Sequence, residues 1–174
     1  NEPHAPFRLA NKQRGVMGCR AAPMFAGEGR FMAIPRTRTY DGPALFSYGF
    51  RPFFLFGAFY AAIAVPLWIL VYLGHVDLPV LYPAMEWHAH EMIYGYLAAI
   101  ITGFLLTAVP NWTGRLPLNG WPLVMLAMVW LAGRIAVAMS AKLGWVATAL
   151  VDCAFLMMVA ISVLREIVAG KNWS

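Results

Sequence analysis

Four apolar runs, each long enough to cross a lipid bilayer, constrain the fold of this chain more than any other feature. They cover residues 53–74, 88–110, 122–141 and 145–169. A transmembrane helix needs about 20 mostly apolar residues, and a backbone in hydrocarbon must satisfy its own hydrogen bonds. Transmembrane strands would instead alternate in polarity over segments of about ten residues, a pattern that this sequence lacks. The sequence therefore predicts an all-α, polytopic transmembrane helix bundle with four spans.

The composition agrees with a membrane protein. Of the 174 residues, 61% are hydrophobic and 12% are charged, whereas soluble domains carry about 25% charged residues. The two cysteines, Cys19 and Cys153, are too few and too far apart to form a disulfide framework. An ordinary soluble domain and a disulfide-stabilised secreted domain are therefore excluded.

The positive charges are distributed unevenly along the chain. The net charge is +5 at pH 7, which could indicate nucleic-acid binding, but most of the Lys and Arg residues precede the first apolar run and none lies in residues 75–87. Membrane proteins carry their excess of Lys and Arg in cytoplasmic segments. We therefore expect a multi-pass protein surrounded by membrane lipid, with both ends in the cytoplasm and residues 75–87 outside, and no nucleic-acid partner.

The first 44 residues differ from the rest. They are rich in Arg, Gly, Pro and Ala and show neither a helical nor a strand period, which is typical of disordered segments. The sequence therefore predicts a disordered cytoplasmic tail over residues 1–44 and a transmembrane portion of a larger membrane domain over residues 45–174. Met32 resembles a natural start, in which case the 31 residues before it would not be native.

Two histidines stand at the start of the second apolar run, in the segment Trp-His-Ala-His-Glu at residues 87–91. Imidazole is the commonest metal ligand in proteins and a usual axial ligand of haem iron. His88 and His90 are therefore candidate cofactor and metal ligands. They lie about 200° apart on a helix, so they cannot both chelate one ion there.

Each of these histidines has polar neighbours at helical spacing. Glu86 and Tyr94 lie four residues from His90, and Glu91 lies three residues after His88. Side chains at these separations share one face of a helix. A carboxylate or phenol beside a metal-bound imidazole is the usual supporting arrangement.

Two further ionisable residues lie inside the third and fourth apolar runs. Arg134 and Asp152 are each nine residues from Leu143, which is at the centre of the expected turn. An antiparallel hairpin would therefore place them at one depth, roughly 10 Å from the outer surface at 1.5 Å per residue. Opposite charges at matching depth relieve much of each other's burial cost. Together with the polar residues of the second run, they would form one polar layer in the outer third of the membrane.

Spacing alone leaves three uses of this layer open. It could be a hydrogen-bond network that holds the helices together, a site of haem or copper ligation, or a pathway for ions or small molecules. In the third case the chain would be half of a polytopic transporter. The chain contains no complete catalytic set that we recognise, so enzymatic activity also stays open.

Three longer motifs follow one another along the chain. They are Gly-Phe-Arg-Pro-Phe-Phe at residues 49–54, Trp-His-Ala-His-Glu-Met at residues 87–92, and Gly-Phe-Leu-Leu-Thr-Ala-Val-Pro-Asn-Trp-Thr-Gly at residues 103–114. With Leu-Ala-Gly-Arg at residues 131–134, their order and spacing resemble the NnrS family of bacterial inner-membrane proteins. The resemblance extends from about Met32 to the end of the chain.

This resemblance implies a haem- and copper-containing protein of the inner membrane, linked to the nitric oxide response and to nitrosative-stress tolerance in denitrifying and other bacteria. Members have more spans than the four found here, so the chain resembles an N-terminal fragment whose partner helices follow in the same protein. If the family's cofactor ligands include the histidines of this motif, His88 and His90 are those ligands here, with nitric oxide as the molecule that the metal binds. The other three runs contain no histidine, so further helices would complete the metal site.

Overall fold

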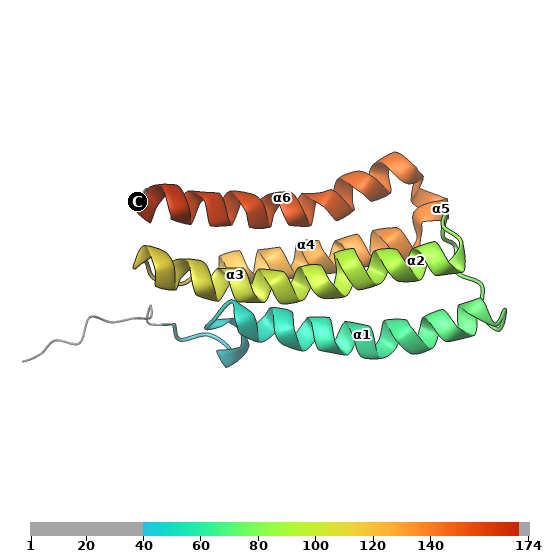
Figure 1. Cartoon of the computed structure of the whole chain (residues 1–174), viewed down its shortest axis with the longest axis horizontal. Coiled ribbons are helices and arrows are strands. Elements are labelled where there is room, and N and C mark those ends of the chain that lie inside the picture. The colour runs from blue at the N-terminus through green and yellow to red at the C-terminus, as the bar shows by residue number, and fades with distance from the viewer. Residues whose placement is uncertain (1–39, 171–174) are drawn as a thin grey trace, which may run out of the picture. The chain divides into compact units, whose positions relative to one another are not determined.

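The computed structural model describes residues 40–170. It contains four long helical segments (Figure 1). They are α1 (Phe50–Tyr72), a continuous stretch made of α2 (Ala84–His90), η2 (Glu91–Leu97) and α3 (Ala98–Thr113), then α4 (Trp121–Ala138) and α6 (Trp145–Gly170). Each segment is long and apolar enough to cross a membrane. The predicted all-α transmembrane bundle is therefore confirmed. The predicted disorder of the tail concerns residues that, apart from 40–44, lie outside the described part of the chain.

The helix boundaries differ from the predicted spans by a few residues. Helix α1 begins at Phe50 and continues through Pro66 without a break. The second segment begins before its apolar run, which starts at residue 88: Pro83 is the N-cap and the helix starts at Ala84. Helix α4 ends early, at Ala138. The turn expected around Leu143 contains instead a short helix, α5 (Ser140–Leu143).

Helix α3 is at the centre of the packing. It contacts α1 on one side and α6 on the other, and α4 packs mainly against α6. Helices α1 and α3 approach closely at two glycines. A Cβ at Gly57 would lie 3.4 Å from the Ala99 Cβ, and a Cβ at Gly103 would lie 3.3 Å from the Phe50 Cα. Small residues allow helices in membranes to approach closely, which increases their van der Waals contact.

Both ends of the bundle are tied by hydrogen bonds between segments far apart in sequence. At the end that contains α5, the Leu81 N–H donates to Ser140 Oγ at 2.9 Å, and the Ala141 N–H donates to the Pro79 carbonyl at 3.0 Å. At the other end, the Gly120 N–H donates to the Phe46 carbonyl at 2.9 Å. These hydrogen bonds fix how the helices are aligned along the bundle axis, and therefore which residues of neighbouring helices face one another.

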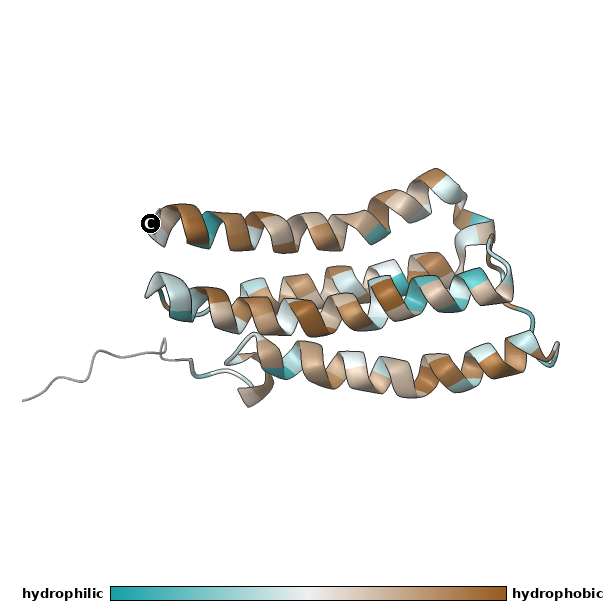
Figure 2. Ribbon diagram, in the orientation of Figure 1, coloured by the Kyte–Doolittle hydropathy of each residue, from teal (hydrophilic) through white to brown (hydrophobic). Residues whose placement is uncertain are grey.

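Hydrophilic residues interrupt the apolar helices at few places (Figure 2). Within the described residues, the buried polar or charged residues are Glu91, Thr102, Arg134, Ser140, Thr148 and Asp152. Both threonines donate to carbonyls four residues earlier in the chain, and Ser140 accepts the loop hydrogen bond described above. The three charged residues remain, and they come from three different helical segments.

Candidate functional site

Arg134 is at the centre of the buried charges. Its side chain is 4% exposed, and its Nη1 donates to Glu91 Oε2 at 2.8 Å. Its Nη2 donates to Asp152 Oδ1. The ion pair between α4 and α6 that equal spacing from Leu143 predicts is therefore present, and Glu91 of the second segment joins it. One guanidinium thus binds two carboxylates and connects η2, α4 and α6.

Tyr60 brings the remaining long helix, α1, into contact with these charged residues. Its hydroxyl donates to Glu91 Oε2, and its ring packs edge-on against Trp130 with centroids 5.6 Å apart. Tyr60 is not among the residues that the sequence predicts for this site. A signal was available, since tyrosine favours the membrane interface and a phenol in the middle of an apolar span usually needs a hydrogen-bond partner.

His90 also joins the buried charges. Its Nε2 lies 3.2 Å from Asp152 Oδ2, and its Nδ1 lies 3.6 Å from Glu91 Oε1. Its ring stacks between Tyr94, at a centroid distance of 4.8 Å, and Tyr82, at 5.7 Å. We call the set formed by Tyr60, His90, Glu91, Arg134 and Asp152 the buried cluster.

The backbone beneath the buried cluster is a π-helix. Residues 91–97 form η2, in which the hydrogen bonds span five residues rather than four. A Cβ at Gly95 would lie 2.8 Å from Arg134 Nη1 and 2.9 Å from Glu91 Oε2, so glycine leaves the space that these side chains fill. The Gly95 carbonyl accepts the Trp130 indole N–H at 3.0 Å. Wide turns of this kind are frequent at functional sites.

A second glycine allows the ion pair between α4 and α6 to form. A Cβ at Gly133 would lie 3.2 Å from Asp152 Oδ1 and 3.5 Å from the Asp152 Cα. The missing side chain brings α6 close enough for Arg134, the next residue, to reach Asp152. The Gly-Arg pair in the motif at residues 131–134 thus has a direct packing role.

His88 lies apart from the buried cluster. Its ring stacks on Trp68 of α1, with centroids 4.1 Å apart and an angle of 20° between the planes. Its Nδ1 is buried and has no hydrogen-bond partner in the described part of the chain. The spacing suggested Glu91 as its neighbour, but Glu91 instead bonds to Arg134 and Tyr60. Glu86, the other predicted supporting carboxylate, is exposed.

The two histidines therefore occupy separate environments. Between residues 40 and 170, no group of three or more His, Cys, Asp or Glu side chains is placed to hold a metal ion. A metal site built from three such ligands therefore does not arise within these residues. A haem iron is a different case, because it takes one axial nitrogen from a histidine. The Nδ1 atoms of His88 and His90 are both buried, and neither has a hydrogen-bond partner among the residues described.

The family model described as NnrS protein matches residues 44–174. The chain belongs to the NnrS family. The match spans η1 (Ala44–Phe46), the four long helical segments, His88 and the whole buried cluster. No curated protein and no solved structure matches the chain. Membership in the NnrS family and the four apolar helices together identify a multi-pass membrane protein.

Proposed function

We propose that this chain acts in the nitric oxide response and in tolerance of nitrosative stress, as part of a haem- and copper-containing membrane protein. The observation that supports this proposal is the NnrS family match over residues 44–174, since that family is generally associated with haem and copper. The haem iron would supply a centre that binds diatomic gases. The chain's own residues would position that centre and shield it.

In this proposal His90 would hold the haem iron through one ring nitrogen. Its Nε2 faces Asp152 Oδ2 at 3.2 Å, and a metal-bound histidine usually donates its second ring N–H to a carboxylate. That donation would leave Nδ1, which lies 3.6 Å from Glu91 Oε1, as the nitrogen that holds the iron. Stacking between Tyr82 and Tyr94 fixes the plane of the ring. In this proposal Asp152 is a positioning residue, and Arg134 holds Asp152 in place.

His88 would hold a metal independently of His90. Stacking on Trp68 fixes its ring, and its buried Nδ1 is unpaired in the described structure. Because His90 packs with α6 and His88 packs with α1, the two imidazoles would serve different ligation sites. Copper would then need further ligands from outside residues 40–170.

The positive-inside distribution sets the proposed orientation. We place the chain in the inner membrane with both ends in the cytoplasm, because most Lys and Arg residues precede α1 and none lies in residues 75–87. The loop between α1 and α2 and the short helix α5 would then face outward. His88, His90 and the buried cluster would lie in the outer part of the membrane.

Absorption spectra of the full-length protein test this proposal. We expect a Soret band that weakens in His88→Ala or His90→Ala and is unchanged in His75→Ala, since His75 is an exposed loop residue. Gel filtration of each variant would show that the fold is retained. A colourless wild-type preparation without metal, or a Soret band unaffected by both His88→Ala and His90→Ala, would contradict the proposal.

A further inference from the structure

The motif at residues 49–54 has no part in the buried cluster, and it builds a tightly packed turn at the start of α1. Gly49 is buried, and a Cβ at this position would lie 2.5 Å from the Leu106 Cβ of α3. Phe53 is fully buried in the apolar core. Arg51 stands between these two buried residues in the sequence, yet it is exposed. The motif therefore fixes the backbone at Arg51 and leaves its side chain at the surface.

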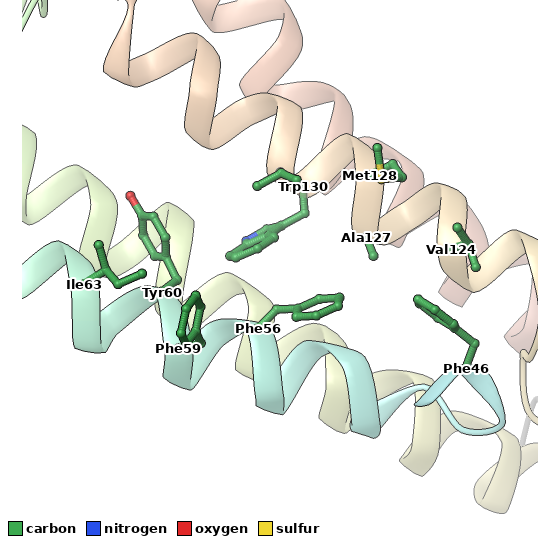
Figure 3. Close-up of a pocket in the computed structure, with 10 residues that line it drawn as sticks. Phe46, Phe56, Phe59, Tyr60, Ile63, Val124, Ala127, Met128 and Trp130 are labelled. Carbon is green, nitrogen blue, oxygen red and sulfur yellow. The ribbon is translucent and has the colours of Figure 1, made fainter. Parts of the chain in front are cut away.

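The turn that precedes Arg51 is anchored on α4. The Gly120 N–H donates to the Phe46 carbonyl at 2.9 Å, and the Phe46 side chain packs against the apolar core. Figure 3 shows the Phe46 ring pointing toward α4, where Val124 and Ala127 line the same cavity. Helix η1 and the start of α1 therefore form a fixed support for the Arg51 side chain.

Hydrogen bonds and aromatic rings hold the Arg51 guanidinium in one place. Its Nη1 donates to the Ala44 carbonyl and to Ser47 Oγ, both at 2.8 Å. Its Cζ lies 5.2 Å from the centre of the Tyr48 ring and 5.9 Å from the centre of the Phe50 ring, within the range of a cation–π interaction. An arginine usually loses rotamer freedom when it binds a ligand. Here most of that freedom is lost before any ligand binds.

The positive charge of Arg51 has no acidic partner in the described part of the chain. The carboxylates that form ion pairs within residues 40–170 are Glu91, Asp152 and Glu166, and each of them pairs with another residue. The two N–H groups of Nη1 are the ones that bond to the chain. The N–H groups of Nη2 and Nε remain, and they form a planar fork of the kind that binds phosphate oxygens in pairs.

Exposed tryptophans mark the level of the lipid headgroups at this end of the bundle. Trp112, near the end of α3, is 62% exposed, and Trp121, at the start of α4, is 72% exposed. Tryptophan side chains concentrate at the boundary between hydrocarbon and headgroups. The hydrogen bond between Gly120 and Phe46 joins the start of α4 to the turn before α1, so Arg51 lies near the same level. The anions at that level are the phosphates of phospholipids.

We propose that Arg51 binds the phosphate of an anionic phospholipid such as phosphatidylglycerol. The fork of Nη2 and Nε would hold two phosphate oxygens, and the acyl chains would lie along the exposed side chains of Phe54 and Leu55 on α1. A zwitterionic headgroup fits less well, because its ammonium group would lie beside a guanidinium that no described carboxylate neutralises. This site uses neither histidine of the proposed haem site, so it is independent of haem ligation.

Native mass spectrometry of the full-length protein tests the inference. The protein would be released from nanodiscs that contain equal amounts of phosphatidylglycerol and phosphatidylcholine with the same acyl chains, and we expect it to retain phosphatidylglycerol preferentially. Arg51→Gln removes the cation and its fork, and we expect about tenfold weaker retention of phosphatidylglycerol, as for the loss of a hydrogen bond to a charged group. Arg165→Gln is the matched control, because Arg165 is also exposed and lies near the end of α6, at the same end of the bundle (Figure 1). We expect no loss in this control.

Glycerol phosphate, which carries the phosphate but no acyl chain, is the control ligand. At millimolar concentration it should leave the retained lipid unchanged, whereas displacement would assign the site to a soluble phosphate and overturn the lipid assignment. Equal retention of the two lipids by the wild-type protein, or equal losses in Arg51→Gln and Arg165→Gln, would overturn the proposal as well. The Soret band of the same variants reports on haem ligation separately, so failure of one proposal is distinguishable from failure of the other.

Discussion

Arg134 shows at the scale of a single residue why a buried charge can persist in a membrane protein. A lone arginine at the centre of a helix costs roughly 2.5–3.5 kcal/mol on insertion scales. Here its guanidinium binds Glu91 and Asp152 at once. Replacing a buried ion network by well-packed apolar groups is often neutral or stabilising, whereas removing a single member is costly. The network therefore fixes how the three helical segments are placed relative to one another, and it adds little to the net free energy of unfolding.

The substitution Arg134→Met should destabilise the protein strongly. It leaves the carboxylates of Glu91 and Asp152 buried without their cation, and breaking a buried pair in this way costs about 3–5 kcal/mol. Unfolding of the purified protein in increasing dodecyl sulfate would measure the loss. The matched control is Arg115→Met. Arg115 pairs with Glu166 at 2.5 Å, but its side chain is 38% exposed, so we expect about 1 kcal/mol or less. Equal losses in the two variants would contradict the assigned role of Arg134.

The sequence predicts some of these residue contacts but not others. The Arg134–Asp152 pair follows from equal spacing about Leu143, because a helical hairpin converts spacing along the chain into depth. Tyr60 and Trp68 could not be assigned in the same way. A phenol in an apolar span indicates that Tyr60 has a hydrogen-bond partner, but which residues Tyr60 and Trp68 meet depends on how α1 is rotated about its own axis. The hydropathy of α1 does not give that rotation.

At the scale of elements, the π-helix η2 links the backbone to the buried cluster. Its wide turn lies where Glu91 and Gly95 meet Arg134 and Tyr60. Hydropathy locates the span that contains it, yet it does not reveal the wide turn, because the residues of a π-turn and an α-turn have the same apolar character. The short helix α5 is missed for a similar reason: its place depends on hydrogen bonds between Pro79, Leu81 and residues 140–141.

The substitution Gly95→Ala tests the tight packing over this π-helix. The added methyl group would lie within 3.0 Å of Arg134, Glu91 and Tyr60 side-chain atoms, so the charged groups would have to separate. Overpacking typically costs about 1–3 kcal/mol, measured again by unfolding in dodecyl sulfate. Gly57→Ala is the control, since its methyl group would meet its nearest neighbours at 3.3 and 3.4 Å. If Gly95→Ala proved as mild as Gly57→Ala, the close packing over η2 would not be needed for stability.

At the scale of the whole molecule, the bundle is only partly buried within itself. In the apolar window of α1, 11% of the residues are buried, compared with 44% in α4. The exposed faces of α1 must therefore contact lipid or other helices. The hydropathy of the sequence predicts that these helices lie in a membrane, and their mutual packing follows from small residues such as Gly57 and Gly133 that composition alone does not single out.

The orientation of the bundle in the membrane predicts which loops can be labelled from outside the cell. In a variant without Cys19 and Cys153, we would introduce Asp77→Cys in the α1–α2 loop and, separately, Leu116→Cys in the α3–α4 loop. Both positions are exposed. The excess of Lys and Arg before α1 should keep that end of the chain in the cytoplasm. A membrane-impermeant maleimide added to intact spheroplasts should therefore label position 77, and it should label position 116 only after lysis. The reverse pattern would place the buried cluster near the cytoplasmic side and would contradict the orientation on which the proposed outer haem site depends.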